Sequence, residues 1–366
     1  MAAQRSGSSE QVCGSGSESA NVASMGARLA VTREQVLAYR RRVTALDERL
    51  PMGGASLRQV AWAGLADSVP RAALLCLHAR VEDVRPDTWE HESLVQLWGP
   101  RFSVYVVAAV DRAVFTLGRT SDLAERRALG QDLAADRLEK FLQGRRLPVA
   151  EAARGIGVGH PSALRYAAPT GRLVVRWDGA RQPLLWMVSQ PEMGVTEARL
   201  ELARRYLHAM GPGTVEGFGA WAGVKSRTAA ATLEALRPEL TPVDTPVGEA
   251  WVLAADEATL RQPAGEPAPV RLLPSGDTFF LLQGADRELL VPEPDRRKQL
   301  WPSRVWPGAI LIDGDVVGVW RRAQHVLNAH PWTRLSARQR QAVEAEATAL
   351  PLPGVDRDIV IHWANA

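Results

Sequence analysis

The fold is decided by residues 148–188, PVAEAARGIGVGHPSALRYAAPTGRLVVRWDGARQPLLWMV. This stretch begins with a short helical segment, continues through a glycine-rich turn and enters a second helical segment at Pro161. Two alternating apolar segments then flank Asp178-Gly179, a dipeptide that type I′ hairpin turns prefer, and they predict a β-hairpin. Helix, turn, helix and hairpin in this order are typical of a winged-helix unit.

The same order occurs on both sides of this stretch. Upstream, Thr32 and Gln35 form a capping-box pattern at the start of a helix, two more helical segments follow, and residues 94–107 predict a strand or hairpin. Downstream, an amphipathic segment over 196–210 and two further helical segments lead to two strands around Thr245-Pro246. The repeats lie roughly 70–80 residues apart. The sequence therefore predicts three tandem winged-helix units, over residues 29–118, 119–190 and 191–256.

The character of the sequence changes after residue 256. From about Glu266, proline, glycine and alternating apolar residues predominate, and GAILIDGDVVGVWRR (308–322) predicts a hairpin around Asp313-Gly314. A polar helix is expected over 336–350, and the segment DIVIHWA is expected to rejoin the sheet as a closing strand. Residues 257–366 are therefore predicted to form an antiparallel β-barrel domain with one helix, which makes the whole chain an α+β protein.

Composition restricts the classes of protein to which the chain can belong. Its 366 residues are 46% hydrophobic and 23% charged, which indicates a globular protein of several units. Residues 1–28 are rich in Ser, Gly and Ala and are expected to form a disordered tail. No apolar run is long enough to span a bilayer, so we expect a cytoplasmic location and no membrane partner. The formal net charge is +3, which permits a nucleic-acid partner without requiring one.

Motifs for metals and cofactors are absent from the sequence. Cys13 lies in the tail and Cys76 lies in an apolar run, so neither a disulfide nor a cysteine metal site is expected. The sequence has no Walker A motif and no glycine-rich dinucleotide motif after a strand. We therefore expect no metal and no cofactor, nucleotides included.

Four phrases carry a resemblance to a known family. They are WGPRFSVYVV (98–107), TVEGFGAWAG (214–223), DRELLVPEPDRRKQLW (286–301) and PGAILIDGDVVGVWR (307–321). With these phrases in this order, most of the chain resembles the AlkZ-like (YcaQ/AlkZ) winged-helix DNA glycosylases of bacteria. The resemblance implies three winged helices followed by a C-terminal β-barrel. It also implies a monofunctional glycosylase that excises an N7-alkylated purine, in base excision repair or, for bulky natural-product adducts, in antibiotic self-resistance.

The resemblance breaks at the catalytic motif of the family. Family members carry Gln-x-Gln, or a variant with Asp or His at one position, in a phrase of the form Gly-Leu-Gln-x-Gln. The matching stretch here is GLADS (64–68), with Ala66 and Ser68 at the glutamine positions. Either neighbouring residues carry out the catalytic chemistry, or the chain binds DNA without catalysing base excision. The alternative function is therefore a non-catalytic winged-helix DNA-binding protein, such as a regulator or a damage-sequestering protein.

Asp67 and Ser68 are the candidate catalytic residues. Alkylation at N7 gives the purine a positive charge and weakens its glycosidic bond, so the enzyme must hold a water near C1′ and stabilise the developing charge. A carboxylate can do both, and a hydroxyl can orient water. Gln59 and Gln96 are weaker candidates. The alternative is that Asp67 and Ser68 only cap the helix that begins near Pro70.

Two groups of basic residues are candidates for binding the phosphates of duplex DNA that carries an alkylated base. Arg176 and Arg181 flank the predicted hairpin turn, and wing tips commonly lie along the phosphate backbone. The second group is the compact cluster Arg296, Arg297 and Lys298. Ordinary surface charge is the alternative for both groups.

Overall fold

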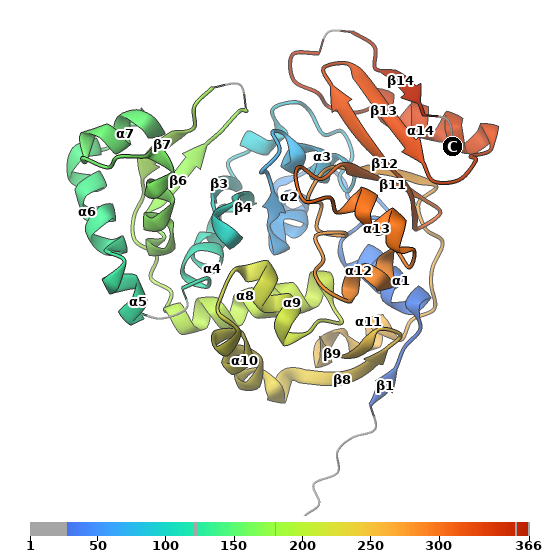
Figure 1. Ribbon diagram of the computed structural model, residues 1–366, viewed down its shortest axis with the longest axis horizontal. Helices are drawn as coiled ribbons and strands as arrows, with labels where there is room; N and C mark the ends of the chain where they lie inside the picture. Colours follow the sequence, from blue (N-terminus) through green and yellow to red (C-terminus); the bar gives the residue numbers. More distant parts are fainter. Residues whose placement is uncertain (1–27, 121–122, 180, 356, 365–366) are drawn as a thin grey trace, which may run out of the picture.

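The computed structural model describes residues 28–120, 123–179, 181–355 and 357–364 of the chain. Over these ranges the protein has a mixed α+β architecture with four small sheets (Figure 1). The tail predicted for residues 1–28 lies outside the described residues except for Arg28. Within the described ranges, no helix combines the length and the apolar character needed to cross a bilayer.

The first unit begins at the predicted capping box. It contains α1 (Arg33–Val43), α2 (Gly54–Val60), β2 (Leu65–Ala66), α3 (Ala72–His78), β3 (Leu94–Trp98), β4 (Val104–Ala108) and α4 (Arg112–Leu117). The Thr32 hydroxyl accepts the backbone N–H of Gln35 at 3.2 Å, and the Gln35 side chain accepts the backbone N–H of Thr32 at 2.9 Å. The strand order is β2-β4-β3, and β3 and β4 form the hairpin expected over 94–107.

The second unit forms the left-hand part of the molecule in Figure 1. It contains α5 (Leu123–Ala128), α6 (Gln131–Leu142), β5 (Leu147–Pro148), α7 (Val149–Gly155), the 3₁₀ helix η5 (Pro161–Thr170), β6 (Leu173–Arg176) and β7 (Leu184–Met187). The predicted hairpin is present, but Arg176 pairs with Leu184, so its connection spans residues 177–183. The two-residue type I′ turn is therefore wrong. The carboxylate of Asp178 accepts the backbone N–H of Arg181 at 2.9 Å, which stabilises a longer loop.

The third unit recruits the start of the described chain into its sheet. It contains α8 (Val195–Met210), α9 (Val215–Ala222), α10 (Ser226–Ala235), β8 (Leu240–Thr245) and β9 (Gly248–Leu253), and β1 (Leu29–Ala30) pairs parallel with β8. The Thr214 hydroxyl accepts the Gly217 N–H at 3.0 Å and caps α9. Thr245 pairs with Gly248 across the turn between β8 and β9.

The C-terminal part corrects the predicted antiparallel barrel. It contains α11 (Glu257–Leu260), β10 (Val270–Leu273), α12 (Asp286–Leu290), α13 (Pro294–Leu300), β11 (Gly308–Ile312), β12 (Asp315–Ala323), β13 (Val326–Pro331), α14 (Ala337–Thr348) and β14 (Val360–Trp363). The five strands form an open sheet in sequence order, and β14 rejoins it parallel to β13. Helix α14 packs Val343 and Ala347 onto the apolar face with Leu272 and Leu327, so the sheet buries this face without closing. The hairpin at Asp313-Gly314 is confirmed, with Ile312 opposite Asp315.

One central core joins the first unit, the third unit and the C-terminal part. This cluster of buried side chains includes Leu37, Leu207, Phe218, Phe280 and Leu311. The second unit has a core of its own, which Trp98 and Val104 of the first unit extend. The β6–β7 hairpin therefore lies against β3, which is an edge strand of the sheet that carries the GLADS motif.

Candidate functional site

The GLADS motif places its side chains on opposite sides of one extended segment. The ladder of β2 continues past Ala66, because the Asp67 N–H donates to the Val104 carbonyl at 2.8 Å. Successive side chains of a strand point to opposite faces. Ala66 packs toward the C-terminal part, where a Cβ built on Gly276 would lie 3.4 Å from the Ala66 Cβ. Asp67 is only 1% exposed, whereas Ser68 is exposed to solvent.

The Asp67 carboxylate is fully engaged inside the protein. Its Oδ1 accepts the Ala73 N–H at 3.0 Å, and its Oδ2 accepts the Gln96 amide at 2.6 Å. The residue before α3, Arg71, has φ of 71° and provides no side-chain cap, so Asp67 caps this helix from upstream. Burial raises the pKa of Asp67 to about 7, against the lowering effects of both hydrogen bonds and of the Arg71 charge.

Gln96 connects the motif to the second unit. Its amide donates to the Trp177 carbonyl at 3.3 Å, and its carbonyl accepts the Trp177 N–H at 2.5 Å. Trp177 directly follows β6, so the Asp67–Gln96 pair fixes the base of the loop between β6 and β7. The other glutamine candidate, Gln59, lies apart from this network and lines a small cavity beside Arg80.

A cleft of about 1020 Å³ opens beside the motif. It is bounded by the loop after β2, the loop between β6 and β7, the turn between β12 and β13, and the segment before β14, and Figure 1 shows the two hairpins on either side of α3. Gly179 packs directly against the loop after β2, because a Cβ at Gly179 would come within 2.3 Å of the Pro70 Cβ. The φ of 78° at Gly179 also favours glycine. The cleft is lined by Pro70, Arg71, Asp178, Gly179, Arg322, Gln324, His325, Pro353, Gly354, Val355 and Arg357.

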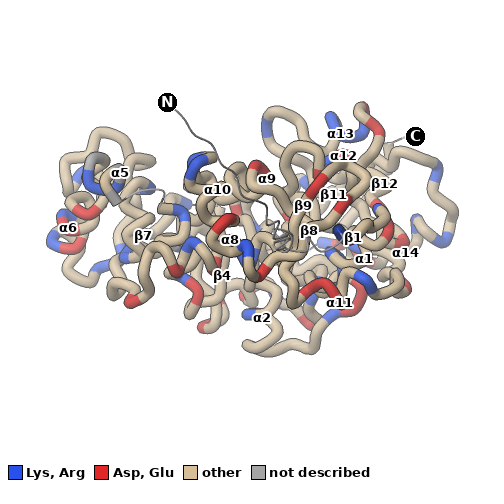
Figure 2. The backbone as a smooth tube through the Cα atoms, turned by 90° about the horizontal axis from the view of Figure 1, so that it is seen from below, with Lys and Arg blue, Asp and Glu red and all other residues tan. Residues whose placement is uncertain are grey.

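The side chains that line the cleft carry an excess of positive charge. Among the described lining residues there are three arginines, Arg71, Arg322 and Arg357, and one carboxylate, that of Asp178. The Arg71 guanidinium lies 4.4 Å from the centre of the Trp89 ring, and its buried Nη1 has no hydrogen-bond partner among the described residues. Figure 2 shows acidic and basic positions intermixed along α6 of the second unit.

The predicted hairpin arginines lie on the β6–β7 hairpin, whose loop bounds the cleft. Arg176 is the last residue of β6, and its guanidinium forms a 2.5 Å ion pair with Glu90 while lying 5.8 Å from the Trp89 ring centre. Arg181 is exposed in the same loop as Asp178. The loop between the two arginines contacts Pro70 at Gly179, but neither arginine is among the described residues that line the cleft, and their DNA contact stays a prediction.

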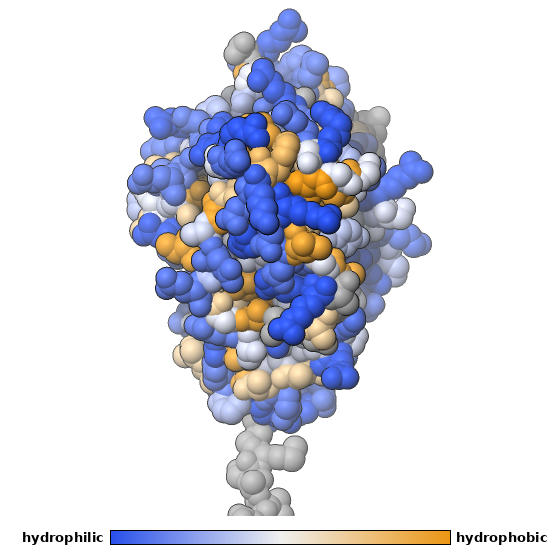
Figure 3. All heavy atoms as spheres, turned by 90° about the vertical axis from the view of Figure 1, so that its left-hand side faces the viewer, coloured by the Kyte–Doolittle hydropathy of each residue, from blue (hydrophilic) through white to orange (hydrophobic). Residues whose placement is uncertain are grey.

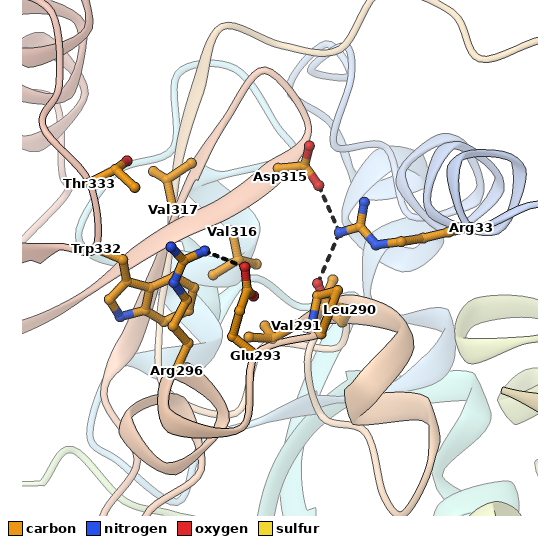
Figure 4. A pocket seen from close by; sticks show the side chains of 11 residues that line it. Arg33, Leu290, Val291, Glu293, Arg296, Asp315, Val316, Val317, Trp332 and Thr333 are labelled. Atoms are coloured by element: carbon orange, nitrogen blue, oxygen red, sulfur yellow. Dashed lines mark hydrogen bonds and ion pairs between the residues drawn. The ribbon is translucent and has the colours of Figure 1, made fainter. Parts of the chain in front are cut away.

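The second predicted group of basic residues, Arg296, Arg297 and Lys298 on α13, lies away from this cleft. Each of its cations has an acidic neighbour: Arg296 pairs with Glu293 at 2.8 Å, Arg297 with Glu288 at 3.8 Å and Lys298 with Asp295 at 2.9 Å. Arg296 lines a separate cavity of about 290 Å³, in which Arg33 pairs with Asp315 at 2.9 Å (Figure 4). The structure therefore does not join this cluster with Asp67 and Ser68, and its DNA contact stays a prediction.

Several residues of the cleft were missed by the sequence reasoning. Arg71 looks like an ordinary residue at the start of a helix, and Arg322 and His325 look like polar residues at a hairpin end. No local signal marks them, because they approach each other only through the packing of the C-terminal part on the first unit.

An arginine-lined cleft between small helix-and-hairpin units is typical of nucleic-acid-binding proteins. Residues 60–351 match the family described as DNA glycosylase AlkZ-like, and the chain belongs to this family. The family prediction from the sequence is thus confirmed.

Two relatives extend this finding. An interstrand DNA cross-link repair glycosylase of Streptomyces sahachiroi is 31% identical over 158 residues, which are 41% of this chain and 41% of that protein. The match thus spans less than half of the curated relative. The solved structure of the DNA glycosylase AlkZ from the same organism is similar with a TM-score of 0.73, over 92% of this chain and 100% of that chain. At 21% identity this likeness shows the fold.

Proposed function

We propose that this protein is a monofunctional DNA glycosylase that hydrolyses the N-glycosidic bond of an N7-alkylated purine in duplex DNA. The observation that carries the proposal is the arginine-lined cleft beside the motif loop of an AlkZ-like chain. A volume of about 1020 Å³ suits a bulky, natural-product-derived adduct better than a methylated base alone. Such an enzyme would serve in base excision repair or antibiotic self-resistance.

The three helix-and-hairpin units support duplex DNA as the partner. In the proposal each unit is a winged helix, with a hairpin that lies along the phosphate backbone. The β6–β7 hairpin is the wing nearest the motif, since Gly179 contacts Pro70 and Arg176 lies beside Trp89. The arginines of the cleft would neutralise phosphates around the damaged nucleotide.

The two motif residues have different roles in this proposal. Departure of an N7-alkylated base needs no general acid, because the base leaves as a neutral group. The exposed Ser68 hydroxyl orients the attacking water. Asp67 positions the motif through Ala73 and Gln96. The direct electrostatic role predicted for Asp67 requires its carboxylate to exchange the Gln96 amide for the DNA, and it stays a prediction.

The test is incubation of the purified protein with duplex DNA that contains N7-methylguanine or a bulkier N7-alkylguanine. We expect abasic sites that become strand breaks only after alkali, and slower base release by Ser68→Ala at unchanged DNA affinity. DNA binding without base release would support the non-catalytic alternative. That alternative is favoured by Ala66 and Ser68, which occupy the glutamine positions of the family motif.

A further inference from the structure

The second unit carries the positive charge of the molecule. Residues 119–190 contain twelve Lys and Arg residues and seven Asp and Glu residues, an excess of five, whereas the whole chain has a net charge of +3. Hydrophilic side chains dominate the outer side of this unit, with apolar side chains scattered among them (Figure 3). A polyanion such as DNA is the partner that such a charge distribution attracts.

One face of the sheet in this unit holds an ordered part of this charge. Leu185 is fully buried in the core of the unit, so its neighbour on β7, Trp186, points to the opposite face. Val174 pairs with Trp186 across the sheet and shares this face. Arg146 precedes β5, and its guanidinium lies 4.5 Å from the centre of the Trp186 ring.

The same arrangement continues toward the cleft. Arg176 follows Val174 by two residues on β6 and therefore points to the same face, where its guanidinium lies 5.8 Å from the Trp89 ring centre. Arg71 lies 4.4 Å from the same ring and lines the cleft. The arginine–tryptophan strip is therefore Arg146, Trp186, Arg176, Trp89 and Arg71, and it leads from β5 to the cleft.

The geometry of the strip suits phosphate groups better than bases. Trp89 is only 6% exposed, so a base cannot stack on it. A guanidinium that lies over an aromatic ring keeps its N–H edge free for a phosphate oxygen, and the ring limits its motion. Arg146 is exposed and has no acidic partner among the described residues, so its guanidinium is available to a phosphate. Within the strip, only Arg176 is paired, to Glu90.

We propose that the arginine–tryptophan strip binds the backbone of duplex DNA on one side of the damaged nucleotide, so that the DNA footprint of the protein is asymmetric about the cleft. The proposal rests on the proposed function for the position of the damaged nucleotide in the cleft. It adds a binding surface that extends from the cleft toward β5 and recognises undamaged flanking duplex.

The experiment uses two short duplexes with the same abasic-site analogue, one with flanking DNA only on its 5′ side and one only on its 3′ side. We expect Arg146→Gln to lower affinity about fivefold for one of the two duplexes, to leave the other unchanged, and to reduce the salt slope by about 0.9, the value for one phosphate contact. Trp186→Leu should lower affinity for the same duplex, because the stacked guanidinium loses its support.

The matched control is Arg237→Gln. Arg237 lies 4.5 Å from the Trp251 ring centre in the third unit, the same stacking distance as in the Arg146–Trp186 pair, and lies outside the strip. Unchanged affinity of Arg146→Gln for both duplexes, equal loss on both, or an equal loss in Arg237→Gln would overturn the proposal. Base release is measured in a separate assay. Asymmetric binding without base release would support the role of the strip and contradict the proposed glycosylase activity.

Discussion

Asp67 is the most constrained residue of the motif. A carboxylate that is 1% exposed loses most of its hydration, and two N–H donors compensate only in part. Its pKa of about 7 lies far above the value of 3.8 for a free side chain. Between these two values the folded protein holds a proton on Asp67 that the unfolded chain has released. Raising the pH through this window therefore lowers the free energy of unfolding, by on the order of 4 kcal/mol.

Replacement of Asp67 by asparagine removes the pH-dependent contribution of its carboxyl group to stability. In Asp67→Asn the amide group can accept only one of the two N–H donors, from Ala73 or from Gln96, so we expect a lower melting temperature at acidic pH. The difference in melting temperature between wild type and Asp67→Asn should narrow as the pH rises from about 4 to about 7, because only the wild type loses stability there. Above pH 7 this difference should stay constant. Thermal melts over this range are the measurement. A difference that does not vary with pH would show that Asp67 does not titrate in the folded protein.

At the scale of elements, Gln96 determines the position of the hairpin that closes one side of the cleft. Its three hydrogen bonds join β3, Asp67 and the backbone of Trp177. In Gln96→Met the volume is retained and the hydrogen bonds are lost. We expect faster trypsin cleavage at the exposed Arg181 and a higher KM for base release, with a smaller change in kcat.

A matched variant distinguishes this effect from general destabilisation. Gln59→Met removes a glutamine of the same unit that makes no contact with the hairpin, and it should leave cleavage at Arg181 unchanged. If Gln96→Met is cleaved at the wild-type rate, the hairpin is held by other contacts.

Local elements could be predicted from the sequence because their causes are local. The Thr32–Gln35 capping box and the turn at Asp313-Gly314 each depend on residues a few positions apart. Closure of the C-terminal sheet depends instead on which element covers its apolar face, and the periodicity of α14 does not reveal that it packs there. The cleft was not predictable for the same reason, since Arg71 and Arg322 meet only in the folded chain.

For the whole molecule, a buried ion pair fixes the C-terminal part on the first unit. The Arg80 guanidinium donates to both carboxylate oxygens of Asp277 at 2.7 Å, and both side chains are almost fully buried. Asp277 also accepts the Phe279 N–H at 2.9 Å, and Arg80 donates to the Thr44 carbonyl at 2.8 Å. This pair lies at the junction between the first unit and the C-terminal part.

Removal of one partner should destabilise the junction. We expect Asp277→Asn to lower the free energy of unfolding by about 3 kcal/mol, because the Arg80 charge stays buried without its counter-ion. Urea denaturation measures this change. The double variant Arg80→Met, Asp277→Leu leaves no buried charge and should recover part of the loss. A double variant that is less stable than Asp277→Asn would contradict this account of the junction.

The central claim is that base release takes place in the cleft beside the GLADS motif. Single-turnover release of N7-alkylguanine from duplex DNA, measured for the wild type and for Pro353→Trp, tests it most directly. Pro353 is exposed and lines the cleft, so tryptophan there narrows the cleft without replacing Asp67 or Ser68. We predict base release by the wild type and loss of most of it in Pro353→Trp at an unchanged melting temperature. No release by the wild type above spontaneous depurination, or equal rates for the two proteins, would contradict the account.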